Sequence, residues 1–289
     1  MNKKVLGGFY MALAASIWGG MYVVSKLILT VLQPLLLVWL RYVVALIVLA
    51  LWMVITRQSW RIHRKDMPAI LAIGMIGYTL SIGAQFYGTK LSTAQMGAMI
   101  TSATPAFMVV FGRIFLGERV TLRRAVSAVL ATIGVLMVVG IGGFNRSYQL
   151  GGFILVIAAL TWALMSVFVK RVPHSYSQVA VTMYAILTAT LAITPFVYAP
   201  LMRLSPGVFF HPVIFGGVLY LGVVSTAGAF FLWNKGLQWL DAGTGGLYFF
   251  FQPLIGTWLG WLILGERVGF LFWIGAFFIL LGVSLVIKE

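Results

Sequence analysis

The chain contains an internal repeat, and each copy has an odd number of apolar segments long enough to cross a membrane. Residues 7–26 align with residues 151–170 at a constant offset of 144, with nine identities in twenty positions. Trp18 matches Trp162 in this window, and the two windows also end on the same residue type, lysine. Matches of this kind in register favour duplication over a shared apolar composition.

A second pair of windows extends the repeat. Residues 94–120 align with residues 242–268 at an offset of 148, with nine identities in twenty-seven positions. Pro105 matches Pro253, and the run Leu-Gly-Glu-Arg-Val closes both windows. Repeats of this length in an apolar chain are typical of transporter architectures.

Composition places both copies in lipid. The chain is 62% hydrophobic and 9% charged, which is too apolar for a soluble protein of 289 residues. A helix of about 20 residues crosses roughly 30 Å of hydrocarbon. Ten apolar runs approach that length, five in each copy: 5–25, 35–55, 68–89, 95–115, 122–142, 151–169, 179–199, 213–233, 243–263 and 269–287.

Five crossings per copy turn the second copy upside down relative to the first. The sequence therefore predicts an all-α membrane protein with ten transmembrane helices in two inverted five-helix repeats, residues 1–146 and 147–289. The connections are short, so we expect one membrane domain. The first segment is longer than a typical signal-peptide core and has a copy at 151–170, so we expect it to be a membrane helix.

The basic residues set the expected orientation. With a cytoplasmic N-terminus, 14 of the 20 lysines and arginines fall on the cytoplasmic side. This bias predicts a multi-pass protein of the plasma (inner) membrane with both termini in the cytoplasm. The net charge of +15 then reflects topology and contact with the lipid bilayer, and we expect no nucleic-acid partner.

Polar and aromatic residues recur along single faces of several apolar helices. Such residues are costly in lipid unless they face protein or water, so they predict a central, uncharged cavity with aromatic walls for a small amphipathic or aromatic solute. The alternative is that the rings form interfacial belts and the hydroxyls serve helix packing; for the two glutamines we favour binding. The candidate binding residues are Trp18, Tyr22, Tyr78, Ser81, Gln85, Thr101, Trp162, Tyr248 and Gln252.

Pro105 and Pro253 are predicted near the middle of the fourth and ninth helices. Each removes one backbone hydrogen bond and frees the carbonyl group one turn earlier. We expect them to be hinges on which the repeats move; static kinks are the alternative.

Glycines give two structural expectations. The Gly-Glu pairs at 117–118 and 265–266 are expected to end their helices and to place a carboxylate beside the N-terminus of the next helix. Gly256 and Gly260 form a GxxxG pair, which predicts a close helix contact inside the bundle or between subunits.

Arg41 is the one basic residue clearly inside an apolar segment. Two roles remain open for it. Its side chain either reaches toward the membrane surface as an anchor or binds an anionic group.

Several kinds of chemistry lack support in the sequence. There is no cysteine, the three histidines show no metal-ligand spacing, and the five acids are all predicted at segment ends. We therefore predict no metal and no cofactor, and gradient-driven movement rather than proton antiport through a buried acid.

Three sequence features together resemble the EamA-type members of the drug/metabolite transporter superfamily. They are the run Ile17-Trp18-Gly19-Gly20 followed by Ser25-Lys26, the spacing from Pro34 to Arg41, and the Leu-Gly-Glu-Arg run used twice. The resemblance covers nearly the whole chain. It implies an inverted-repeat bundle, two cytoplasmic termini and a pathway lined mainly by helices 1, 3, 4, 6, 8 and 9.

The resemblance is strongest to bacterial metabolite exporters, some of which move amino acids. We therefore predict a transporter, not an enzyme, that exports or exchanges small metabolites by alternating access, as a monomer or weak homodimer. An importer or drug-efflux permease of the same family remains open. A membrane-embedded enzyme acting on lipid or isoprenoid substrates would need clustered acids or histidines, and a binding or assembly subunit would carry no solute flux.

Overall fold

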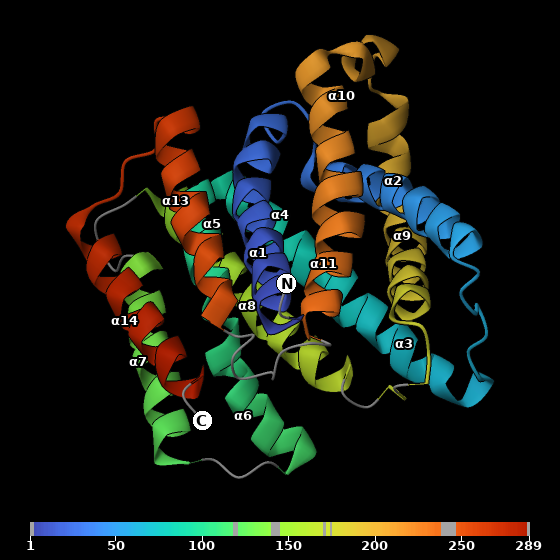
Figure 1. Ribbon diagram of the computed structural model, residues 1–289. Coiled ribbons are helices and arrows are strands. Elements are labelled where there is room, and N and C mark those ends of the chain that lie inside the picture. Colours follow the sequence, from blue (N-terminus) through green and yellow to red (C-terminus); the bar gives the residue numbers. More distant parts are fainter. Residues whose placement is uncertain are drawn as a thin grey trace.

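The structure, a computed structural model, describes residues 3–117, 121–139, 145–169, 172–173, 175–237 and 247–287. All regular elements within these ranges are helical (Figure 1). Seven helices are long and apolar enough to cross a membrane, and three shorter apolar helices span Ala125–Val138, Phe251–Leu264 and Phe270–Gly282. The predicted all-α membrane class is confirmed, while the count of ten crossings stays a prediction.

Two of the predicted helices in the first repeat are composite. The third contains a π-helical segment, η2, and the fourth is split into α5 and α6. The elements are α1 (Lys3–Ile28), α2 (Pro34–Ile55), the short η1 (Arg64–Asp66), α3 (Met67–Ile73), η2 (Gly74–Ser81), α4 (Ile82–Leu91), α5 (Ala94–Thr101), α6 (Thr104–Leu116) and α7 (Leu122–Val139).

The second repeat follows the same plan. A π-helical segment, η4, lies in its third helix, and a 3₁₀ turn, η5, directly precedes α13 in its fourth. The elements are α8 (Arg146–Val169), α9 (Gln178–Met202), η3 (Pro206–Phe210), α10 (Pro212–Leu219), η4 (Tyr220–Gly228), α11 (Ala229–Leu237), η5 (Leu247–Phe250), α13 (Phe251–Leu264) and α14 (Phe270–Ile287).

Local sequence explains where several helices begin and end. Pro34 starts α2, where its missing N–H group costs nothing. The side chains of Thr93 and Ser177 cap α5 and α9 by accepting hydrogen bonds from backbone N–H groups. Gly117 and Gly265 follow α6 and α13 with φ values of 67° and 64°, a left-handed conformation that suits glycine.

The two repeats are antiparallel in the bundle. Lys26, near the end of α1, donates a hydrogen bond from Nζ to the carbonyl oxygen of Ser92. Gly151, near the start of α8, lies at the same place, because a Cβ atom there would be 2.9 Å from the Ser92 nitrogen. Since α1 and α8 carry the aligned windows 7–26 and 151–170, equivalent helices reach this point with opposite ends.

Glycine pairs bring helices of different repeats into close contact. Figure 1 shows α7 and α14 side by side, and a Cβ atom on Gly134 would lie 2.6 Å from the carbonyl oxygen of Gly275. A Cβ atom on Gly256 would lie 2.5 Å from the Ala98 side chain, and one on Gly260 would lie 2.8 Å from Gln95. The GxxxG contact is therefore inside the bundle, between α13 and α5.

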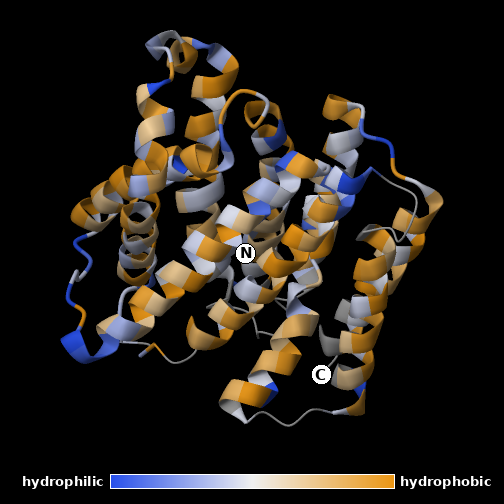
Figure 2. Cartoon of the chain, turned by 180° about the vertical axis from the view of Figure 1, so that it is seen from behind, coloured by the Kyte–Doolittle hydropathy of each residue, from blue (hydrophilic) through white to orange (hydrophobic). Residues whose placement is uncertain are grey.

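The outer surface matches a lipid environment. Hydrophobic residues follow the helices, and hydrophilic residues gather in the connections at the two ends (Figure 2). Large apolar side chains such as Leu191, Phe196 and Trp258 are more than half exposed. This surface favours a protein that spans the bilayer many times.

Candidate functional site

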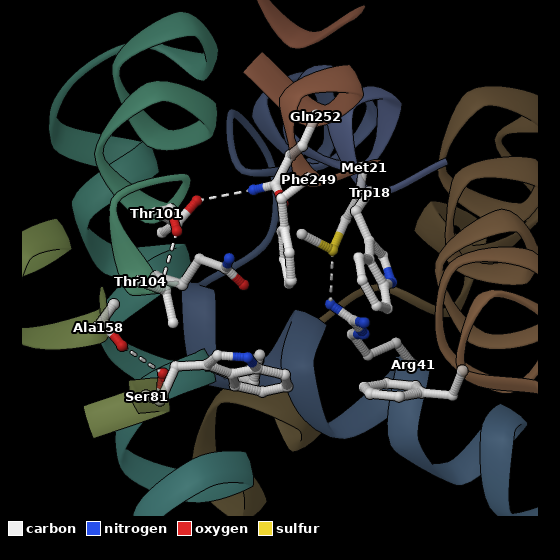
Figure 3. A pocket seen from close by; sticks show the side chains of 13 residues that line it. Trp18, Met21, Arg41, Ser81, Thr101, Thr104, Ala158, Phe249 and Gln252 are labelled. Carbon is white, nitrogen blue, oxygen red and sulfur yellow. Dashed lines mark hydrogen bonds between the residues drawn. The ribbon is translucent and has the colours of Figure 1, made fainter. Parts of the chain in front are cut away.

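A cavity lies between helices of both repeats (Figure 3). The empty space between its lining residues, counted together with the part that is open to solvent, is about 520 Å³. Figure 3 shows Thr101 and Thr104 on one side of this space and Arg41 and Met21 on the other. The lining residues are Trp18, Met21, Arg41, Ser81, Ile82, Gln85, Thr101, Thr104, Ala158, Trp162, Phe230, Phe249 and Gln252.

A chain of hydrogen bonds crosses one wall of the cavity. Gln85 donates from Nε2 to the Tyr22 hydroxyl, which lies 2.6 Å from Thr101 Oγ1. Thr101 donates its own hydrogen to the carbonyl oxygen of Gly97 at 2.8 Å and accepts from Gln252 Nε2, also at 2.8 Å. The Tyr22 hydroxyl is therefore the donor to Thr101. The chain ties α1, α4 and α5 of the first repeat to α13 of the second.

Both predicted hinge prolines follow a change in helix geometry. The fourth predicted segment is one apolar span, Ala94–Phe115, in which two turn residues with helical backbone angles separate the end of α5 at Thr101 from the start of α6 at Thr104. Pro105 has no N–H group for the Thr101 carbonyl, and the Thr104 hydroxyl donates to that oxygen instead at 2.7 Å. Pro253 lies just inside α13, after the turn η5.

Aromatic rings also line the cavity. Trp18 lies 5.6 Å from Phe230 and 6.1 Å from Phe249, measured between ring centroids. Trp162 lies 6.2 Å from Phe230. The indole nitrogen of Trp18 donates to the carbonyl oxygen of Ser225 in the π-helical segment η4, at 3.1 Å. These rings, tilted to one another by 29° to 62°, give the cavity an apolar, aromatic lining.

Arg41 places a positive charge in the cavity. Its side chain is only 2% exposed, so it is not a surface anchor, and the cavity is not uncharged as the polar stripes predicted. The guanidinium group donates from Nε and Nη2 to Thr226 Oγ1 at 3.0 and 2.7 Å and from Nη1 to the Met21 sulfur at 3.3 Å. It also lies 5.2 Å from the ring centroid of Phe86.

The structure brings most of the sequence-predicted binding residues together. Two lie behind the wall: Tyr22 is in the hydrogen-bond chain, and Tyr78 packs its ring 6.0 Å from Trp162 and 5.9 Å from Phe230. Those that line the cavity are Trp18, Ser81, Gln85, Thr101, Trp162 and Gln252.

Tyr248 lies apart from this group. Its ring stacks on Phe251, and its hydroxyl group occupies the place that a Cβ atom on Gly8 would take. It is not among the residues that line the cavity. The sequence pattern placed Tyr248 and Gln252 on one face of a regular helix. The change from 3₁₀ geometry in η5 to α-helical geometry in α13 lies between them, so the two side chains do not share that face.

The cavity also has apolar lining residues that the polar stripes in the sequence did not indicate, among them Met21, Ile82, Ala158, Phe230 and Phe249. For Phe249 the repeat itself held the signal. At the offset of 148, Phe249 is the counterpart of Thr101, and Gln252 is the counterpart of Thr104. Aligned positions of the two repeats thus face the same cavity.

An acid of the second repeat holds a helix start of the first. The Glu266 carboxylate accepts hydrogen bonds from the backbone nitrogens of Ala94 at 2.7 Å and Gln95 at 3.0 Å. The sequence placed this carboxylate beside the N-terminus of the next helix, α14. That expectation is wrong, because Glu266 caps the start of α5 instead. Burial raises the pKa of Glu266, although these two donors and nearby Lys26 favour its charged form. The predicted equivalent, Glu118, lies outside the described residues.

Fold and cavity together define a multi-pass membrane protein of the transporter class, with two antiparallel repeats around a central site. Within the described residues no group of three potential metal-ligating side chains comes together. The chain belongs to the EamA-like transporter family, whose sequence profile matches it twice, at residues 5–140 and 149–288.

Related proteins agree with this assignment. The chain is 25% identical over 297 residues to a probable amino-acid metabolite efflux pump of Escherichia coli, covering 98% of this chain and 94% of that one. It is 69% identical over 71 residues to the putative permease-like protein YdzE of Bacillus subtilis, covering 25% of this chain and 91% of that one. A crystal structure with 19% identity shares the fold, with a TM-score of 0.65 over 98% of this chain and 96% of the other.

Proposed function

We propose that this protein exports or exchanges small amphipathic metabolites, amino acids among them, across the plasma membrane. The observation that carries the proposal is the cavity itself, which both repeats line with aromatic rings and a few hydrogen-bonding groups. A site shared by two antiparallel repeats can face either side of the membrane when one repeat moves against the other. The E. coli relative named as an amino-acid metabolite efflux pump supports both the direction and the solute class.

Contacts between the repeats at both ends of the bundle support alternating access. At one end Glu266 of the second repeat binds the start of α5. At the other end the Tyr176 hydroxyl donates to the Asp66 carboxylate at 2.5 Å. Rocking of one repeat against the other would loosen one set of contacts while the other holds. Pro105, just after the turn residues between α5 and α6, and Pro253, just after η5, are the positions at which we expect the bending.

The test is flux through the purified protein. The full chain is reconstituted into liposomes and supplied with a panel of labelled amino acids and aromatic metabolites. We expect saturable flux of at least one solute down its gradient. Liposomes that show no protein-dependent flux for the whole panel would contradict the proposal.

Substitutions then test the site. Gln85→Ala and Gln252→Ala should each lower the flux, because both amides line the cavity and belong to its hydrogen-bond chain. Gln33→Ala is the matched control, since Gln33 is exposed and its side chain makes no capping hydrogen bond at the start of α2. Equal flux in all three variants would show that neither amide contributes to solute binding.

A further inference from the structure

The Arg41 guanidinium is buried without an anionic partner in the described part of the chain. It has five N–H donors. Three of them are used, two on the neutral Thr226 hydroxyl and one on the Met21 sulfur, which is a weak acceptor. A charge that is 2% exposed and paired only with neutral groups carries a large desolvation cost. The remaining N–H groups are available to an acceptor in the cavity.

No acid that the structure describes can neutralise this charge. Asp66 and Glu266 are the acids within the described residues. Asp66 is bound to Tyr176, and Glu266 is bound to the start of α5. Arg41 is also the one charged residue among those that line the cavity. A single positive charge matches a solute group with a single negative charge, such as a carboxylate.

An unpartnered acceptor lines the same cavity. Gln85 is 9% exposed, and its Nε2 donates to Tyr22, but its buried Oε1 has no hydrogen-bond partner. Native structures rarely leave such an atom unsatisfied unless a ligand or water binds it. An N–H donor on the solute would satisfy Gln85 Oε1.

We propose that the cavity recognises an apolar or aromatic amino carboxylate, whose carboxylate pairs with Arg41 and whose ammonium group donates to Gln85 Oε1. The inference rests on the proposed transport function and names the chemistry of its solute. Arginine binds carboxylates through two parallel N–H donors, which fixes the orientation of the bound group as well as its charge. The rings of Trp18, Trp162 and Phe230 then enclose the apolar body. Arg41 is thereby the residue that determines specificity for solutes that carry a carboxylate group.

Equilibrium binding to the purified full-length protein tests this assignment. Three labelled probes share one aromatic body and differ in charge: L-phenylalanine, 3-phenylpropanoate and phenethylamine. We expect the two carboxylates to bind roughly 10- to 100-fold more tightly than the amine, the range for a hydrogen-bonded charge pair. We also expect L-phenylalanine to bind more tightly than 3-phenylpropanoate, because Gln85 Oε1 accepts from its ammonium group.

Variants separate recognition from folding. Arg41→Gln should remove the preference for carboxylates. Thr226→Asp keeps Arg41 and places a carboxylate against its guanidinium group. This internal carboxylate should compete with the solute and weaken carboxylate binding about as much as Arg41→Gln does, although the positive charge is still present. Arg203→Gln removes a charge of the same type at an exposed site and should bind all three probes as the wild type does.

Each outcome decides the inference. Equal binding of amine and carboxylates, binding of no carboxylate, or wild-type carboxylate binding in Thr226→Asp overturns it. Equal binding of L-phenylalanine and 3-phenylpropanoate overturns the role of Gln85. Carboxylate binding without flux in liposomes would instead refute the proposed transport function. Flux of solutes that have no carboxylate group, together with no binding of the carboxylate probes, would refute this inference alone.

Discussion

The Thr101 hydroxyl is the junction of the hydrogen-bond chain that joins the two repeats. It accepts from Tyr22 at 2.6 Å and from Gln252 at 2.8 Å, and it donates to the carbonyl oxygen of Gly97. Valine has nearly the same shape as threonine and a similar helix propensity, so Thr101→Val removes the hydroxyl with little other change. The variant loses two interhelical hydrogen bonds and leaves two buried donors without a partner.

The expected cost follows from these two bonds. A buried hydrogen bond contributes about 0.5–1.5 kcal/mol to stability, and bonds between membrane helices average about 0.6 kcal/mol. Thr101→Val should therefore lower the free energy of unfolding by about 1–3 kcal/mol. Equilibrium unfolding in mixed detergent micelles, with increasing sodium dodecyl sulfate, measures this change.

Thr132→Val is the matched control. Thr132 lies exposed on α7, and its hydroxyl donates to the carbonyl oxygen of Ala128 at 2.7 Å, the same local bond that Thr101 makes to Gly97. The control removes the local bond alone, so the difference between the variants isolates the bonds between helices. Free energies of unfolding within about 0.3 kcal/mol of each other would refute the coupling of the repeats through Thr101.

Three further predictions concern packing, protonation and energy coupling. Gly134→Ala should destabilise the protein by about 1–3 kcal/mol in the same unfolding assay, because the new Cβ atom meets the Gly275 backbone. Gly216→Ala, where a Cβ atom has no neighbour within 4 Å, should not, and equal losses would contradict the close contact of α7 and α14. Since burial raises the pKa of Glu266 above its ordinary value of 4.5, this group should make the free energy of unfolding fall as pH rises through that raised pKa. Glu266→Gln should remove this component, and an unchanged pH profile would count against it. A pH gradient across the liposome membrane should not drive uphill accumulation, because the described acids, Asp66 and Glu266, lie at the ends of the spans; accumulation would reveal a proton-coupled step.

Much of the fold could be read from the repeat. Matches such as Trp18 with Trp162 located the two copies, and the apolar runs located the helices. The π-helical segments η2 and η4 could not be read in this way. These segments also make contacts with distant helices, such as the hydrogen bond from Trp18 to Ser225 in η4, which no local periodicity records. The interruption between α5 and α6 lies directly before Pro105, where the loss of a backbone hydrogen bond was expected.

The candidate site was predictable where polarity marked it. Gln85, Thr101 and Gln252 stood out because amides and hydroxyls in apolar helices need partners. Phe230 could not be identified in this way, because the sequence alone does not show whether a phenylalanine in an apolar helix faces lipid or a cavity. Arg41 was left open because its depth alone fits either role, and only the position of Thr226 across the bundle decides that it points inward.

Inversion of the repeats is the central claim, and equivalent loops test it most directly. The chain has no cysteine, so single cysteines report without background. Ser59 follows the second helix of the first repeat, and Ser205 follows the second helix of the other; both are exposed. In intact cells a membrane-impermeant maleimide should label Ser205→Cys, whereas Ser59→Cys should react only after permeabilisation. Labelling of both positions from the same side would contradict the antiparallel arrangement.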